Sequence, residues 1–229
     1  MIITVVNCAS PGLGSVVAEN LALLRARAGS KVLLLDAGPG QDCQQWRAAR
    51  VRARLRPAPD VRTLRDFGCA AQLERLRADF RDIVIATDGC GDHDCRWALI
   101  AAQVAVVPLA SDHADIDAHY ECIARLNSAR MFNPGLRVLF VSMAGEHAPA
   151  PLEMCAVRAY VAQVLSAGLA GTVLHLPALA WGADSPGRCA CDTESSTGAA
   201  ELAALYGEVY RTGPASPLPR QIFRPGLST

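Results

Sequence analysis

The chain opens with the stretch Met1–Ala28, which reads MIITVVNCASPGLGSVVAENLALLRARA and decides the fold. Ile2–Val6 is an apolar, β-branched run of the kind that forms a buried strand. Gly12 and Gly14 mark a tight turn, and apolar residues recur with helical spacing from Ser15 onward. The stretch therefore predicts a strand, a glycine loop and a helix, which is the frame of a phosphate-binding loop.

The cation that a phosphate-binding loop requires is missing from this frame. Such a loop presents backbone N–H groups to the phosphates, and a lysine neutralises the phosphate charge. Residues 1–30 contain no lysine. Backbone N–H groups at the helix start near Ser15 could still hold a lone anion. The sequence thus predicts the scaffold of a nucleotide site without its principal positive charge.

Composition limits the classes of protein to which the chain can belong. A length of 229 residues, 51% of them apolar, suits one large core. No apolar run reaches the roughly 18 residues of a membrane span, and the amino terminus lacks the pattern of a secretory signal. The nine cysteines are odd in number and scattered, which favours free thiols in a reducing compartment. We expect a soluble, cytoplasmic protein.

Strand and helix patterns alternate along the rest of the chain. Further strands are expected at Lys31–Leu35, Asp82–Ala86, Val104–Pro108, Leu136–Val141 and Thr172–Leu176. Helices are expected at Cys43–Leu55, Gly68–Asp79, Cys95–Ala102, Ala114–Ala129, Leu152–Ala167 and Gly198–Arg211. Such repeated units predict an α/β domain, with a doubly wound, mostly parallel sheet and helices on both faces. We assign residues 1–212 to this domain and residues 213–229, which hold four of the fourteen prolines, to an extended tail.

With these strands placed, residues 1–212 resemble the ParA/MinD family of deviant P-loop ATPases. The family opens with an apolar strand, a loop of the form N-x-K-G-G-x-G-K-T-T and a helix containing N-L-A. Asn7 and Asn20–Ala22 stand at that spacing here. The family segment V-L-L-x-D-x-D-P-Q is matched by Val32–Pro39, which keeps Asp36. The resemblance implies the P-loop fold, whose cleft binds ATP and magnesium in the family.

The charged positions of the family loop are the ones that this chain replaces. In the same register, Ala9 stands at the signature lysine and Gly14 at the second lysine. Ser15 and Val16 stand at the paired threonines, the first of which binds magnesium in the family. Sliding the register by one residue aligns further glycines, but no register supplies a lysine.

Two aspartates of the later family segments are also replaced. Gly38 stands at the second aspartate of the second segment, which the family uses near the attacking water. A third segment, Phe80–Gly89, resembles the family pattern Y-D-x-V-x-I-D-T-x-G. Within it, Ala86 replaces the aspartate that holds magnesium through water in the family.

The resemblance therefore implies a ParA-like partition or positioning protein that has lost ATPase activity. ATP carries roughly four negative charges, and binding it requires positive charge in a dry cleft. We expect no catalytic residue and no bound cofactor. What remains is a degenerate phosphate loop and switch, made of Gly12, Gly14, Ser15, Val16 and Asp36. The alternative is an active ParA-type ATPase for plasmid or chromosome partition, with a non-standard P-loop and an arginine supplied in trans.

The resemblance also implies the kinds of partner to expect. Family members form dimers over the nucleotide and bind DNA, membranes or adaptors. We expect a homodimer, or a heterodimer with a ParA-like protein, that contacts non-specific DNA or an adaptor protein. The carboxyl end carries a proline-rich tail rather than an amphipathic helix, so we expect no membrane partner.

Arginines gather in one segment of a chain whose 22 basic residues balance 22 acidic ones. Seven fall between residues 47 and 65, namely Arg47, Arg50, Arg52, Arg54, Arg56, Arg62 and Arg65. Two interpretations stay open. The segment is a solvated helical face, or it is a patch for DNA or an acidic partner. In the second case the contacts are expected from Arg47, Arg50, Arg52, Arg54 and Arg56.

Two other polar groupings are assigned no function. The loop Cys90–Cys95 combines two thiols with His93, but its spacing is loose and no second pair completes a zinc site. The aspartates around His113 are interpreted as a polar helix start rather than as an acid–base site. We therefore expect no metal site.

Overall fold

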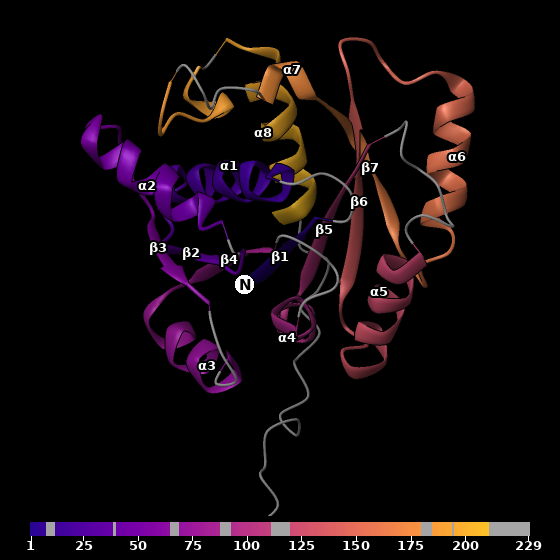
Figure 1. Cartoon of the computed structure of the whole chain (residues 1–229), viewed down its shortest axis with the longest axis horizontal. Helices are drawn as coiled ribbons and strands as arrows, with labels where there is room; N and C mark the ends of the chain where they lie inside the picture. Colours follow the sequence, from indigo (N-terminus) through magenta and orange to yellow (C-terminus); the bar gives the residue numbers. More distant parts are fainter. Residues whose placement is uncertain are drawn as a thin grey trace, which may run out of the picture.

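The computed structural model describes residues 1–7, 12–38, 40–64, 69–87, 93–110, 120–179, 185–193 and 195–210. It contains one seven-stranded sheet in which every neighbouring pair of strands is parallel (Figure 1). The strands are β1 (Ile2–Val6), β2 (Val32–Asp36), β3 (Asp60–Thr63), β4 (Asp82–Thr87), β5 (Val104–Ala110), β6 (Arg137–Ala144) and β7 (Gly168–His175). Their order across the sheet is β3-β2-β4-β1-β5-β6-β7. The expected doubly wound parallel sheet is confirmed.

Helices cover both faces of this sheet. They are α1 (Leu13–Arg27), α2 (Asp42–Arg52), α3 (Cys69–Asp79), α4 (His93–Ala101), α5 (Tyr120–Phe132), α6 (Pro151–Val161), α7 (Leu176–Leu179) and α8 (Thr197–Tyr210), with a short 3-10 helix η2 (Ala190–Asp192). Helices α1, α2 and α8 share one core cluster, and α3, α4, α5 and α6 share the other (Figure 1). In the described part of the chain, no helix is long and apolar enough to cross a membrane.

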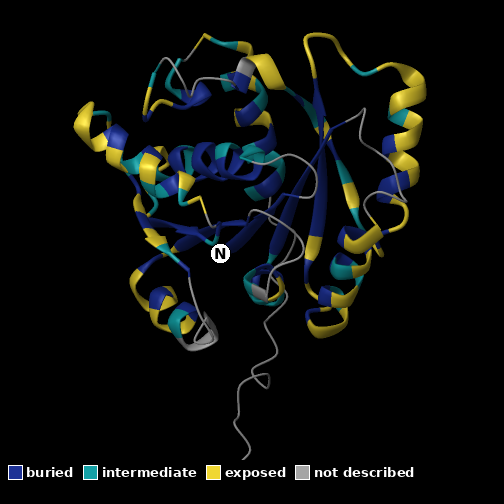
Figure 2. Cartoon of the chain, in the orientation of Figure 1, coloured by how far each residue is buried: buried dark blue, intermediate teal, exposed yellow. Residues whose placement is uncertain are grey.

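Alternating side chains of β1 explain why both faces of the sheet are covered. Ile3 and Val5 join the core under α1, whereas Ile2 joins the core on the opposite face. Thr4 points to that second face, where its hydroxyl donates to the Ala98 carbonyl of α4 at 2.9 Å. A strand buried on both faces reads as a continuous apolar run. Figure 2 shows the central strands buried along their length.

The structure differs from the sequence expectations at several element boundaries. Helix α1 begins at Leu13, two residues before the expected start at Ser15. Strand β3 was not expected, and it forms the edge of the sheet beside β2. The residues assigned to the tail lie outside the described residues, as do the first three residues of the Cys90–Cys95 loop and the group around His113.

The state of the cysteines agrees only in part with the expectation of free thiols. Among the described residues, five cysteines form no disulfide: Cys43, Cys95, Cys155, Cys189 and Cys191. Cys122, on α5, is instead disulfide-bonded. The expectation that no disulfide forms is therefore confirmed at these five positions and is wrong at Cys122.

Candidate functional site

The residues expected to form a degenerate phosphate loop and switch lie at the carboxyl ends of β1, β2 and β4, the edge at which ligands of such sheets bind. Gly12 has a φ of 78°, a left-handed conformation that favours glycine, and directly precedes α1. Gly14 lies close to the strand ends, since a Cβ there would stand 3.1 Å from Asn7 Cβ and 3.2 Å from the Thr87 carbonyl oxygen. Backbone geometry thus requires both glycines. Ala9 lies outside the described residues.

Ser15 and Val16, which stand at the paired threonines of the family, contact other parts of this chain. Ser15 is buried and hydrogen bonds with the thiol of Cys43, at the start of α2. Val16 lines a pocket beside α2. The Val16 N–H donates to the Gly12 carbonyl at 3.2 Å, which closes the first turn of α1.

Asp36, kept from the family pattern, holds the start of α2. Its carboxylate accepts hydrogen bonds from the backbone N–H groups of Gly38, at 3.2 Å, and Gln44, at 3.3 Å. Burial raises the pKa of Asp36 above its ordinary value, although these backbone bonds act in the opposite direction. An aspartate that accepts from the first turn of a helix stabilises that turn. Asp36 therefore has a structural role within this chain.

Carboxyl groups, not cations, gather at this edge of the sheet. Glu19 lies on α1 one turn beyond Ser15 and is 7% exposed. Its pKa is raised well above the ordinary value by burial and by the negative charges of Asp42 and Asp36. Among the described residues, no lysine or arginine forms an ion pair with any of the three carboxyl groups. The described part of the site therefore has the sign of charge opposite to that which a phosphate requires.

Sequence reasoning missed Glu19, although the sequence carried a signal for it. The residue is the one charged side chain in Val16–Leu24, a run that is otherwise apolar except for Asn20, and it lies one helical turn from Ser15. A buried metal ion is not a simple explanation for it. Within the described ranges, no three histidine, cysteine or acidic side chains are placed to hold a metal ion. Ala86, at the magnesium-site position of the family, is buried.

The structure separates the five arginines that were expected to form one surface. Arg52, Arg54 and Arg56 are exposed at and beyond the end of α2. Arg47 is half-buried, donates to the Pro59 carbonyl at 3.0 Å and pairs with Asp60 at 3.0 Å. The remaining one, Arg50, is fully buried and cannot contribute to a surface. Neither a solvated face nor an interaction patch describes the whole segment.

Arg50 is buried because it forms a two-bond ion pair with a carboxylate from the far end of the chain. Its side chain is 0% exposed, and its two terminal nitrogens donate to Asp192 at 2.6 and 2.9 Å. It also donates to the carbonyl oxygens of Pro57, at 2.6 Å, and Gly187, at 3.0 Å. Burial acts to raise the pKa of Asp192, but the hydrogen bonds from Arg50 and the Cys189 N–H, together with the charges of Arg50 and Arg27, outweigh burial and lower that pKa.

The Arg50–Asp192 pair fastens residues 185–193, here called the strap, across α1. Asn20 of α1 accepts from the Cys191 N–H at 3.2 Å. Arg27, at the end of α1, donates to the Cys191 carbonyl and to Asp192, both at 2.6 Å. The strap therefore binds α1 and α2 together, and it connects directly to α8.

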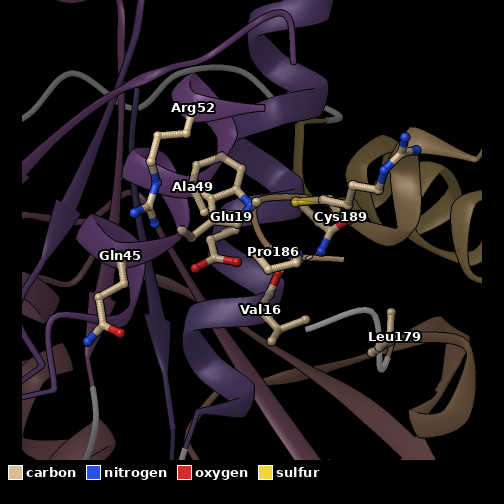
Figure 3. Close-up of a pocket in the computed structure, with 12 residues that line it drawn as sticks. Val16, Glu19, Gln45, Ala49, Arg52, Leu179, Pro186 and Cys189 are labelled. Atoms are coloured by element: carbon tan, nitrogen blue, oxygen red, sulfur yellow. Dashed lines mark hydrogen bonds between the residues drawn. The ribbon is translucent and has the colours of Figure 1, made fainter. Parts of the chain in front are cut away.

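A pocket of about 340 Å³ lies where the strap, α1 and α2 meet (Figure 3). Its lining residues are Val16, Glu19, Asn20, Gln45, Trp46, Ala49, Arg52, Leu179, Pro186, Gly187, Arg188 and Cys189. It shares Val16 with the degenerate phosphate loop but none of the other four residues assigned to it. The indole N–H of Trp46 is buried and has no hydrogen-bond partner.

Comparisons with known proteins find likeness in structure only. No family model matches the sequence, and no curated protein is similar to it. A chain of the MinC:MinD cell division protein complex of Aquifex aeolicus superposes with a TM-score of 0.65 at 16% identity, over 96% of this chain and 98% of that one. The septum site-determining protein MinD of Pyrococcus horikoshii, complexed with Mg-ADP, gives a TM-score of 0.62 at 16% identity, over 92% and 96%.

Plasmid partition proteins have a similar fold. A plasmid partition protein of Borrelia burgdorferi superposes with a TM-score of 0.52 at 14% identity, over 73% of this chain and 89% of that one. Identities this low establish the fold and leave the activity open. The chain thus has the α/β fold of the MinD and ParA-like P-loop proteins.

Proposed function

We propose that the protein is a ParA/MinD-like partition or positioning protein that works through protein or DNA contacts, without ATP hydrolysis. The observation that supports this most strongly is the charge at the carboxyl edge of the sheet. Glu19, Asp36 and Asp42 influence one another there, and no described cation pairs with them. The structural likeness to MinD and to plasmid partition proteins supports the positioning role.

Electrostatics explains why ATP hydrolysis is not part of this proposal. Bound ATP brings roughly four negative charges, and the transition state of phosphoryl transfer requires cations beside its oxygens. Residues 1–30 hold no lysine, and Gly38 and Ala86 replace two acidic side chains used by the family. Glu19, buried beside the same edge, supplies no positive charge to offset the phosphates.

The hydrolysis test uses the purified protein with ATP and magnesium. We expect no phosphate release above the background of a sample treated with a magnesium chelator. Turnover that depends on magnesium would support the alternative of an active ParA-type ATPase with an arginine supplied in trans. A heterodimer with a ParA-like protein remains part of the proposal, so the assay is repeated with such a partner when one is in hand.

The interaction surface that we propose consists of Arg52, Arg54 and Arg56. All three are exposed, and no ion pair involves them in the described part of the chain. An arginine fork binds phosphate or carboxylate oxygens through two hydrogen bonds, so the surface suits a DNA backbone or an acidic adaptor. Arg47 is satisfied by Asp60, and Arg50 is buried, so neither belongs to this surface.

The binding test replaces Arg52, Arg54 and Arg56 with alanine together. The matched control replaces three exposed arginines of the opposite face, Arg75, Arg77 and Arg81, so that the net charge changes equally. If DNA is the partner, the parent binds duplex DNA with an affinity that falls steeply with salt. The first variant loses most of this affinity and the control keeps it. Equal binding by both variants at low salt would contradict the proposed surface.

A further inference from the structure

The pocket between the strap, α1 and α2 contains buried polar groups that the proposed function does not use. Its walls include apolar side chains from three different parts of the chain, namely Val16, Leu179 and Pro186 (Figure 3). Its volume of about 340 Å³ is at the lower end of the range for small-molecule sites. Apolar walls with a few convergent polar groups are typical of a ligand site.

The indole N–H of Trp46 indicates a hydrogen-bond acceptor in the ligand. Trp46 is 7% exposed and lines the pocket, and its N–H has no hydrogen-bond partner among the described residues. Buried donors are almost always paired in folded proteins, because an unpaired one loses its water without a replacement. Arg50 stacks over the indole ring at 5.6 Å and is itself satisfied by Asp192, so it holds the ring without supplying an acceptor.

The carboxyl group of Glu19 indicates a positive charge in the ligand. Glu19 is 7% exposed, lines the same pocket and forms no ion pair among the described residues. Its titratable neighbours are the carboxyl groups of Asp36 and Asp42 and the thiols of Cys43 and Cys189, none of which is a cation. Burial and these carboxyl groups raise the pKa of Glu19, and a hydrogen bond with the Cys43 thiol offsets them only in part. A ligand ammonium group would supply the positive charge that the ionised carboxylate lacks.

The exposed part of the lining has the opposite charge. Arg52 and Arg188 both line the pocket and are exposed, so they lie at its mouth rather than in its interior. In Figure 3 the side chains of Arg52, Gln45 and Glu19 lie on one side of the pocket. Guanidinium groups bind carboxylates through paired hydrogen bonds. The pocket therefore combines a buried carboxyl group that can bind a cation, Glu19, with guanidinium groups at its mouth that can bind an anion.

We propose that this pocket binds a small zwitterion of the amino-acid type, with its ammonium group at Glu19 and its carboxylate on the Trp46 N–H and the mouth arginines. The apolar walls favour an amino acid with an apolar side chain. This binding site shares Arg52 with the arginine surface proposed above, but its contacts at Glu19 and Trp46 lie outside that surface and need no nucleotide, so either proposal can fail without the other.

Isothermal titration calorimetry on the full-length parent protein tests the site with L-leucine, L-methionine and L-phenylalanine. Each is compared with its N-acetyl form, which lacks the ammonium group, and with its amide, which lacks the carboxylate. We expect at least one free amino acid to bind. Both of its blocked forms should bind at least about tenfold more weakly, because each loses a charged hydrogen bond. This comparison requires no variant, so it does not depend on any variant folding.

Two substitutions then assign the contacts. Glu19→Gln keeps the shape of the side chain and should weaken binding of the same amino acid at least about tenfold, and Trp46→Phe should weaken it by removing the N–H. Glu74→Gln, on exposed α3 across the sheet, should leave the affinity unchanged. The proposal is overturned if no amino acid of the set binds, if N-acetyl forms bind as tightly as free ones, or if folded Glu19→Gln binds like the parent.

Discussion

Replacing Arg50 with alanine should remove a large share of the stability of this domain. The side chain is 0% exposed, and its ion pair with Asp192 consists of two bonds of 2.6 and 2.9 Å. Removing one partner of a buried pair leaves the other charge uncompensated, at about 3–5 kcal/mol. The carbonyl oxygens of Pro57 and Gly187 lose their donor in the same substitution. Arg27 still pairs with Asp192, which reduces the loss of stability. Because the unpaired carbonyl groups and the remaining Arg27 pair act in opposite directions, we keep the whole range of about 3–5 kcal/mol.

Equilibrium unfolding in urea, followed by circular dichroism, measures this change. The matched control is Arg52→Ala, two residues along the same helix, whose exposed side chain should change the free energy of unfolding by no more than about 0.5 kcal/mol. The double variant Arg50→Ala, Asp192→Ala should lose less free energy of unfolding than the two single variants lose in sum, because neither charge is then left buried without the other. The reasoning is wrong if Arg50→Ala loses less than about 1 kcal/mol, or no more than Arg52→Ala.

Three further outcomes follow from the same contacts. Glu19→Gln should stabilise the fold increasingly with pH. The pKa of Glu19 is raised in the folded protein above its ordinary value of 4.5. As the pH rises from the unfolded pKa to the folded pKa, the free energy of unfolding of the parent therefore falls by about 1.4 kcal/mol per pH unit. Urea denaturation at several pH values measures this fall. Gly14→Ala should destabilise by about 1–3 kcal/mol, because its Cβ would press on Asn7 and the Thr87 carbonyl, and a lowered urea midpoint would show it. Asp36→Ala should weaken the start of α2 by about 1 kcal/mol in the same measurement, unlike Asp60→Ala at the exposed edge strand.

Hydrophobic periodicity was sufficient to predict the architecture but not the edge of the sheet. The strands β1, β2, β4, β5 and β6 are continuous apolar runs because both of their faces are buried, and each was predicted close to its actual bounds. Strand β3, Asp60–Thr63, has two exposed residues and one fully buried valine, and it directly follows a proline segment. A short strand that pairs on one side only leaves too weak a pattern to be recognised.

The arginine segment could not be interpreted from local sequence because its decisive contact is remote. Arg50 and Asp192 are 142 positions apart, and nothing in the spacing of the neighbouring arginines distinguishes Arg50 from Arg52. The helix that carries both is polar on most of its surface, so charge clustering suggested a single exposed face. The fold instead uses one arginine as an internal tie and leaves the next exposed. Charge clustering thus predicted the exposed residues correctly but not the buried one.

Two internal contacts show how this strand–loop–helix scaffold can be stable without a bound nucleotide. Gly14 fits closely against Asn7 and the Thr87 carbonyl, and Asp36 holds the first turn of α2. Both contacts lie within the chain, so their contribution to stability does not require a nucleotide. Side chains that would act only on a nucleotide, such as a loop lysine, contribute no comparable internal contact. The stability of the domain alone therefore accounts for the presence of Gly14 and Asp36 in this chain.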